Sequence, residues 1–300
     1  MTKKKFFKVD LVPALRRLEI LAKGLISSTI VGGYRSVFKG KGLEFNEYRD
    51  YSEGDDASII DWKASAKTGD ILVRQYIEER DVDVFFLLDT SSNMLFGSTD
   101  KLKAEYMIEL VASLSHAVLE AGDNVGMGLF TDRIIQKLAP SRNKEQFYLI
   151  TKKLLEAEYY GGKFDFTQAC KFALSYLRES TVLIIVSDFS NLLNNPANEE
   201  YLKLITKKFD VISIMIRDPR DREMPENVGQ VVLQDPITNK TLVVEPELIK
   251  QAYENYIKEQ ENKIRELFSK QRANFIDIQT DKSFVKPLVS LFRARASRSR

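Results

Sequence analysis

Oxygen-bearing side chains follow two separate apolar runs of this 300-residue sequence. Asp89, Ser91 and Asn93 come directly after the first run, and Asp188 comes directly after a later one. Because the carboxyl ends of neighbouring parallel strands meet at one edge of a sheet, we expect these side chains to converge. Carboxylate, hydroxyl and amide oxygens are the ligands that Mg²⁺ prefers. The pattern therefore predicts a small oxygen-lined site suited to Mg²⁺.

The composition excludes several other kinds of site. The chain has one histidine, His116, and one cysteine, Cys170. These numbers exclude an internal disulfide framework, a cysteine-rich zinc site and a paired-histidine metal site, and they argue against a Ser-His-Asp triad. No phosphate-binding GxxxxGK[ST] loop follows a strand, so the chain is not expected to bind ATP by itself. Any metal ligands must be mainly oxygens.

The charge balance bears on the partners of the protein, and its apolar segments bear on its location. Lys and Arg number 45 and Asp and Glu 43, a net charge of +2, which gives no reason to expect nucleic acid as a partner. The start, MTKKKFFKV, is not followed by the apolar stretch and cleavage site of a secretory signal. No segment reaches the length of about 18 apolar residues that a membrane span needs. We therefore expect a cytoplasmic protein without a membrane span.

The elements that must position the oxygen-bearing residues alternate along the chain. A chain in which 44% of the residues are hydrophobic and 29% are charged is typical of a globular protein. Apolar runs predict strands, and amphipathic segments predict helices between them. The strands are expected at 82–88, 125–130, 134–138, 182–186, 211–216 and 274–278, and the helices at 100–121, 143–156, 167–178, 197–208 and 247–272. This alternation predicts an α/β fold: a doubly wound, mostly parallel sheet with helices on both faces.

The remaining segments divide the chain into an N-terminal part, a main domain and a tail. Residues 1–80 are expected to hold a first amphipathic helix at 10–24 and a β-rich segment. The main domain is expected over 81–292, with a polar, hairpin-like insertion near 217–245. It ends in a short helix at 283–292, with Asp100 as the N-cap of its first long helix. The last segment, 293–300, is a basic tail expected to be frayed and solvated.

The oxygen-bearing residues resemble the metal-ion-dependent adhesion site (MIDAS) of von Willebrand factor A domains. That site has the form Asp-x-Ser-x-Ser, a distant threonine and a distant aspartate. Asp89, Ser91 and Asn93 match the first motif, with asparagine for the last serine, and Asp188 matches the final aspartate. Phe164 stands where the threonine is expected, which leaves Thr167 as its substitute. The resemblance thus implies a Mg²⁺ site formed by Asp89, Ser91, Asn93, Thr167 and Asp188.

A series of N-terminal motifs narrows the resemblance to one family. These are GYRS at 33–36, GKGLEF at 40–45, YRDY at 48–51, GDD at 54–56, IDWK at 60–63 and AKTG at 66–69. In this order, and with Asp218-Pro219 further on, they closely resemble the "domain of unknown function 58" proteins, which carry a von Willebrand factor A-like domain. The resemblance implies a partnership with a MoxR-type AAA+ ATPase in chaperone-like maturation or assembly of other proteins. It implies no catalytic chemistry.

Polar and aromatic residues of the N-terminal motifs are candidate partner-binding residues. They are Glu44, Arg49, Asp55, Asp56, Asp61 and Trp62. Each also has a structural interpretation: the GDD run is typical of a tight turn, and Trp62 of a packing anchor that holds the N-terminal segment to the sheet. The turn and the anchor are the interpretations that we favour for these two features.

Three functions remain open at this point. The first is a non-catalytic interaction module in which Mg²⁺ bridges to a partner's carboxylate. The second is a metal-free scaffold that binds through the segment from Leu43 to Trp62. The third is a phosphatase with Asp89 as the nucleophile, although Ser91 stands where such enzymes carry a second acid. We expect the first.

Overall fold

The computed structural model describes Tyr34 and residues 44–52, 54–77, 82–235, 238 and 240–298. The helix expected at 10–24 lies outside these residues. No helix in the described part is both long enough and apolar enough to cross a membrane.

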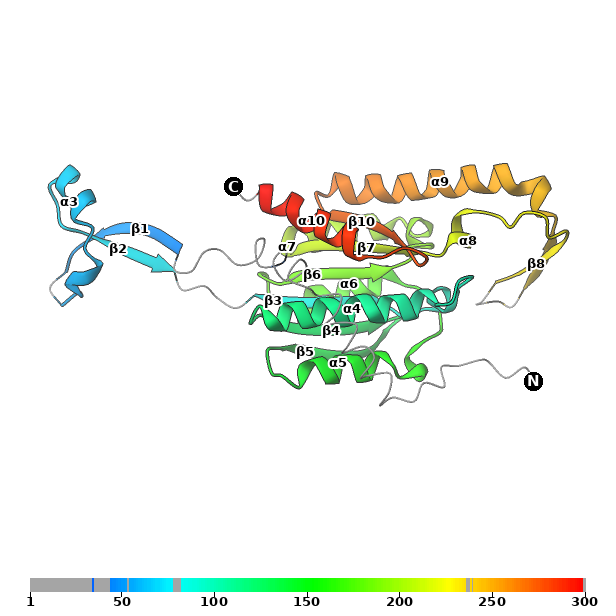
Figure 1. Ribbon diagram of the computed structural model, residues 1–300, viewed down its shortest axis with the longest axis horizontal. Helices are drawn as coiled ribbons and strands as arrows, with labels where there is room; N and C mark the ends of the chain where they lie inside the picture. Colours follow the sequence, from blue (N-terminus) through cyan, green and yellow to red (C-terminus); the bar gives the residue numbers. More distant parts are fainter. Residues whose placement is uncertain are drawn as a thin grey trace.

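A six-stranded sheet forms the centre of the molecule (Figure 1). Its strands are β3 (Asp83–Asp89), β4 (Asn124–Phe130), β5 (Ile134–Ser141), β6 (Val182–Ser187), β7 (Asp210–Arg217) and β10 (Asn274–Gln279). Their order is β10-β7-β6-β3-β4-β5, and all neighbours are parallel except the edge pair β4–β5. The chain winds outward in both directions from β3, so the strand order reverses between β3 and β6. The predicted α/β, von Willebrand factor A-like fold is confirmed.

Helices cover both faces of this sheet, which explains the unbroken apolar runs within β3 (84–88) and β6 (182–186). One face packs against α4 (Lys103–Glu120), α5 (Gln146–Leu154) and α10 (Val285–Arg298). The other packs against α6 (Phe166–Tyr176), α7 (Ala197–Lys208) and α9 (Pro246–Lys270). Each face has its own hydrophobic core, and Cys170 is fully buried in the second.

Two predicted helix boundaries were wrong. The N-cap of α4 is Leu102 and not Asp100, because the Glu105 side chain accepts a hydrogen bond from the Leu102 amide. The last helix continues to Arg298, so most of the segment expected as a frayed tail is helical. In α10, Arg295 pairs with Asp210 at the start of β7, which ties the end of the chain to the sheet.

Tyr34 joins the N-terminal segment to the first core. Its ring is almost completely buried and meets Phe292 of α10 edge-on. Its hydroxyl donates to Oδ2 of Asp123 at 2.8 Å, and Oδ1 of the same carboxylate accepts from the Val82 amide. Tyr34 therefore lies beside the amino-terminal ends of β3 and β4.

A small antiparallel unit precedes the main domain and is drawn apart from it in Figure 1. It consists of β1 (Glu44–Asp50), β2 (Leu72–Ile77) and α3 (Trp62–Thr68). The carboxylate of Asp61 caps α3 by accepting from the amides of Lys63 and Ala64. The Trp62 side chain is 67% exposed, so its interpretation as a packing anchor was wrong.

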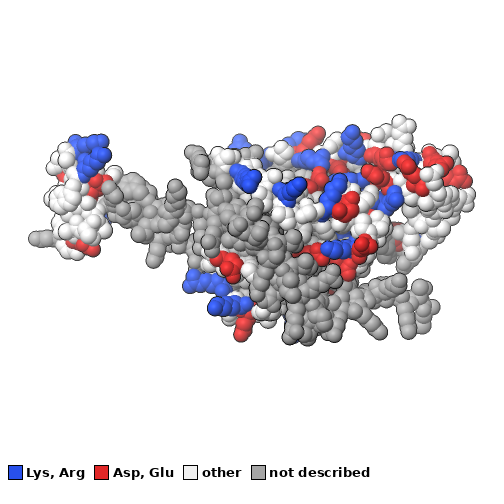
Figure 2. All heavy atoms as spheres, viewed as in Figure 1, with Lys and Arg blue, Asp and Glu red and all other residues white. Residues whose placement is uncertain are grey.

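A β-hairpin leaves the main domain after the short helix α8 (Pro219–Arg222). Its strands β8 (Val231–Gln234) and β9 (Thr241–Val244) pair in antiparallel register, Val232 opposite Val243. Both of these valines are exposed. On the face seen in Figure 2, basic and acidic groups are interspersed over the main domain, in keeping with its balanced charge.

Candidate functional site

Asp89 ends β3 and is completely buried at the carboxyl edge of the sheet. Its Oδ1 accepts from the Ser91 amide at 2.8 Å, and its Oδ2 accepts from the Ser187 hydroxyl at 2.6 Å. Ser187 ends the neighbouring strand β6. The Asp89 carboxylate therefore joins the ends of the two central strands.

Asp188 follows β6 and is paired with a buried lysine. Its Oδ2 lies 2.8 Å from Nζ of Lys103, the first residue of α4, and its Oδ1 accepts from the Ser190 amide. Lys103 is only 2% exposed and also lies 2.9 Å from Oδ2 of Asp221 in α8. A buried charge is tolerated only when it is paired in this way. This ammonium thus pairs with two acids at the edge of the sheet.

The two neighbouring aspartates have opposite pKa shifts. Burial, reinforced by the nearby charge of Asp188, raises the pKa of Asp89 to about 7. Burial acts in the same direction on Asp188, but the charges of Lys103 and Arg217 outweigh it and lower the pKa of Asp188. Asp188 is therefore the acid that carries negative charge, balanced by Lys103.

The charged network extends from Asp188 to helix α9. Arg217, at the end of β7, donates to the Ser190 hydroxyl at 2.8 Å and lies 3.2 Å from the Glu261 carboxylate of α9. Glu261 also accepts from Arg222 at 2.8 Å. Beside this network, the buried Asp218 accepts from the Ser98 amide, so the loop after β3 is tied to the end of β7. The sheet edge is thus held by charges from several elements.

The loops that follow β3 and precede α6 are linked by backbone contacts. The Ser92 amide donates to the Gly162 carbonyl, the Gly162 amide donates to the Ser92 hydroxyl, and the Gly161 amide donates to the Thr90 carbonyl. Both glycines have positive φ angles, 117° and 94°, which favour glycine at these positions. This link places the segment from Lys163 onward beside the Asp89 loop.

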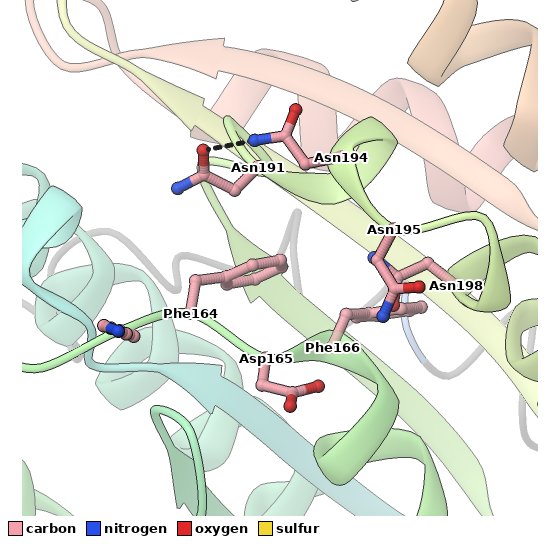
Figure 3. Close-up of a pocket in the computed structure, with 8 residues that line it drawn as sticks. Phe164, Asp165, Phe166, Asn191, Asn194, Asn195 and Asn198 are labelled. Atoms are coloured by element: carbon pink, nitrogen blue, oxygen red, sulfur yellow. Dashed lines mark hydrogen bonds between the residues drawn. The ribbon is translucent and has the colours of Figure 1, made fainter.

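A half-open pocket lies between the start of α6 and the segment before α7 (Figure 3). We call it the asparagine pocket; its volume is about 300 Å³, and it is lined by Lys163, Phe164, Asp165, Phe166, Asn191, Asn194, Asn195 and Asn198. Asn194 donates to Asn191, whereas Nδ2 of Asn191 and Oδ1 of Asn194 have no partner among the described residues. Asp165 caps α6 through Oδ1 alone. The pocket therefore offers both donors and acceptors to a ligand.

The residues predicted to hold Mg²⁺ are brought together only in part. Asp89, Ser91 and Asp188 meet at the sheet edge, and Asn93 lies half-buried in the following 3-10 helix, Ser92–Leu95. The Thr167 hydroxyl instead donates to Oδ1 of Asn198 at 2.9 Å, on the side of α7. Its partner lies 31 positions away, so the sequence did not show that this hydroxyl is already engaged.

The donor set does not fit a resident Mg²⁺ ion. The buried Ser91 hydroxyl makes no well-aligned hydrogen bond to a described residue and is the one feature in favour of an ion. However, both oxygens of Asp89 and both of Asp188 already accept hydrogen bonds, and Lys103 supplies the positive charge. Within the described ranges, no three or more His, Cys, Asp or Glu residues are grouped to hold a metal.

Most of the N-terminal candidates serve the small unit itself. Arg49 forms a bidentate pair with Asp55, whose Oδ2 also accepts from the Ser52 amide. Asp56 caps the 3-10 helix Ala57–Ile59, and Asp61 also accepts from the Tyr48 hydroxyl. Gly54, with a φ angle of 110°, forms the predicted turn before these acids. Glu44 begins β1. Trp62 is left as the exposed aromatic candidate of this group.

Sequence reasoning missed Lys103, Asp221 and the asparagine pocket. Lys103 is spaced by four, seven and eleven positions from Met107, Leu110 and Leu114, all of which are buried on the same stripe of α4. A cation on the apolar stripe of a helix was the signal that could have revealed it. The four asparagines between positions 191 and 198 are a second such signal.

Comparison with known proteins identifies the family of this chain. The family model described as "Protein of unknown function DUF58" matches residues 47–263. The chain belongs to this DUF58 family. A relative is the uncharacterized protein Rv1480 of Mycobacterium tuberculosis, 29% identical over 230 residues, which cover 75% of this chain and 70% of the relative. The uncharacterized protein YeaD of Bacillus subtilis is 29% identical over 79 residues, 26% of this chain and 18% of YeaD.

Solved structures similar to this DUF58 chain include the conserved hypothetical protein BatB from Bacteroides thetaiotaomicron. It is 17% identical, with a TM-score of 0.47, over 72% of this chain and 99% of BatB. The VWA domain of SpRpn10 is 13% identical, with a TM-score of 0.38, over 70% of this chain and 94% of that domain. The fold assignment itself rests on the strand order of the central sheet.

Proposed function

We propose that this DUF58 protein is a non-catalytic interaction module that binds a partner protein at the carboxyl edge of its central sheet. The observation that carries the proposal is the asparagine pocket beside the Asp89 and Asp188 loops. Carboxamides present a donor and an acceptor together, which matches the peptide group of an incoming chain. The partly exposed Phe164 ring adds apolar surface, and the opposite charges of Lys163 and Asp165 balance each other. These features suit an uncharged segment of a protein.

The burial of Asp89 favours binding over catalysis. A phosphoryl-accepting aspartate must reach its substrate, whereas Asp89 has no exposed surface and both of its oxygens accept hydrogen bonds. The Cys170 thiol is buried in the core, and burial raises its pKa well above the ordinary value, which keeps it unreactive. Neither group is placed to act as a nucleophile.

We propose a MoxR-type AAA+ ATPase as the partner, in the cytoplasm, in chaperone-like maturation or assembly of other proteins. The support for this partner is membership of the DUF58 family together with the motif resemblance described above. The fold agrees with such a role because the loops at this sheet edge form the natural binding crevice of a doubly wound domain.

Two other modes of binding are separate proposals. In one, Mg²⁺ held by Asp89, Ser91, Asn93 and Asp188 bridges to a partner carboxylate. The Ser91 hydroxyl, which makes no well-aligned hydrogen bond to a described residue, favours it. In the other, the small N-terminal unit is the binding surface, and the exposure of Trp62 favours it. Each requires a different residue for binding, so the three modes can be distinguished by substitution.

The proposal is tested with the full chain and a purified MoxR-type ATPase from the same source. We expect N191A/N194A to weaken binding by roughly tenfold or more, about 1.4 kcal/mol, in biolayer interferometry. Asn262→Ala on the exposed surface of α9 is the matched control and should bind as the parent does. Unchanged binding by N191A/N194A contradicts the pocket. Loss of binding in Trp62→Ala alone supports the N-terminal surface instead.

A further inference from the structure

We infer that the Lys103 ammonium takes, at this sheet edge, the electrostatic role that a divalent cation would have, so that the site is stable and functional without one. The inference deepens the proposed function by specifying that partner binding is independent of Mg²⁺. Only its partner-binding measurement rests on the proposed function. The arrangement of Lys103, Asp188 and Asp221 carries the rest.

The charge balance around Lys103 disfavours a divalent cation at this position. Nζ lies 2.8 Å from Oδ2 of Asp188 and 2.9 Å from Oδ2 of Asp221. The Lys103 and Asp188 side chains are 2% and 1% exposed, so water screens this pair very little. A divalent ion placed beside the same carboxylates would add two positive charges next to a buried ammonium. The repulsion disfavours the ion as long as Lys103 remains charged.

The position of Lys103 at the start of its helix shows that its acidic partners hold it there. It is the first residue of α4, where the helix dipole favours negative charge and disfavours a cation. Lys101, two positions earlier, is by contrast partly exposed and pairs with Glu109 on the surface. A buried lysine at a helix N-terminus is therefore held there by its acidic partners and by the Phe96 ring, 5.7 Å from Nζ.

The oxygens of Asp89 and Asp188 already accept hydrogen bonds from protein donors. Ser190 and Lys103 donate to the two oxygens of Asp188, and Ser91 and Ser187 donate to those of Asp89. Direct coordination by these oxygens would need their donors to rearrange. Removing the ammonium frees Oδ2 of Asp188. Oδ2 of Asp221, which still accepts from the Asp218 amide, then faces the same vacated position. Lys103→Ala is therefore expected to create a cation site that the parent chain lacks.

The first experiment titrates the parent chain, Lys103→Ala and the matched control Lys101→Ala with Mn²⁺. Bound Mn²⁺ is counted by electron paramagnetic resonance, and the unfolding midpoint is measured with and without the ion. We expect no saturable site in the parent or in Lys101→Ala. In Lys103→Ala we expect one site, and at an ion concentration a few times its Kd a rise of roughly 2–4 °C in the midpoint. Adding Asp188→Asn to Lys103→Ala should abolish both effects.

The outcomes separate this inference from its rivals. A saturable Mn²⁺ site in the parent chain that Asp89→Ala removes overturns the inference and supports the metal-bridged mode. A Lys103→Ala chain that folds and binds no ion overturns it as well. If Lys103→Ala fails to fold, the Mn²⁺ titration of the parent chain still shows whether that chain has a cation site. The double variant Lys103→Met with Asp188→Asn removes one charge of each sign and tests whether the restored balance of charge restores folding. Partner binding by the parent that is equal in EDTA and in Mg²⁺ supports the inference; binding abolished by EDTA overturns it.

Discussion

The hydroxyl of Ser187 donates to Oδ2 of Asp89 at 2.6 Å, across the ends of two neighbouring parallel strands. The same hydroxyl oxygen accepts from the amide of Phe189 at 2.9 Å. Phe189 has a positive φ angle of 51° and is completely buried, a combination that is uncommon for an aromatic residue. Ser187 thus links a buried acid to a strained backbone turn, and the turn directs Asp188 toward Lys103.

The first prediction concerns this link. Ser187→Ala leaves one oxygen of a buried carboxylate without its donor, so we expect the free energy of unfolding to fall by about 1–3 kcal/mol in urea denaturation. Ser213→Ala in β7 is the matched control, because the buried Ser213 hydroxyl has no partner among the described residues and its removal should cost little. Equal losses in both variants would mean that the Ser187–Asp89 bond does not contribute to stability.

The second prediction concerns the pH dependence of stability. An ordinary aspartate in the unfolded chain has a pKa of about 3.9, whereas the pKa of buried Asp89 is raised to about 7. Between these values the folded chain holds a proton that the unfolded chain has lost. Protonation therefore favours folding below about pH 4, and this contribution is lost as the pH rises through about 7.

Asp89→Asn tests this dependence because the amide does not titrate. Urea denaturation at intervals from pH 4 to pH 8 should give a stability difference, parent minus variant, that declines with pH. Asp188, the acid facing Asp89, has a lowered pKa and keeps its charge throughout this range, balanced by Lys103. A constant difference between the two chains over the range would contradict the raised pKa.

The sequence predicted the parts of the fold that depend on local pattern. Continuous apolar runs identified β3 and β6 because both faces of these strands are buried, and Asp89 and Asp188 were placed correctly at their ends. The doubly wound, mostly parallel arrangement followed from the alternation of strands and helices. These features are encoded within short stretches of chain, where periodicity is visible.

The electrostatics of the site were not predictable in the same way. Lys103 meets Asp188 and Asp221, which are 85 and 118 positions away, so no local pattern reveals the pairs. Thr167 was chosen by position in a motif, but its hydroxyl pairs with Asn198 across two helices. Trp62 was interpreted by residue type, and its exposure depends on how the small unit folds. Each of these depends on tertiary contacts.

The third prediction concerns Tyr34 and its attachment to the main domain. Tyr34→Phe keeps the buried ring but removes the hydroxyl that donates to Asp123. Because hydrogen bonds to charged groups are stronger than neutral ones, we expect a loss of about 1.5–3 kcal/mol in the free energy of unfolding. Tyr148→Phe is the control, since that side chain is 48% exposed and should change stability by less than about 0.5 kcal/mol. An unchanged free energy of unfolding in Tyr34→Phe would argue against this attachment.

The fourth prediction distinguishes the two roles considered for Trp62. Because most of its side chain is exposed, Trp62→Ala should change the free energy of unfolding by no more than about 0.5 kcal/mol. Asp61→Ala, one position earlier, removes the cap of α3 and the acceptor of the Tyr48 hydroxyl, and should cost the small unit about 1 kcal/mol or more. Protection of the α3 and β2 amides in hydrogen exchange reports this difference. Loss of protection in Trp62→Ala equal to that in Asp61→Ala would restore the anchoring role, whereas intact protection leaves the indole available for a partner.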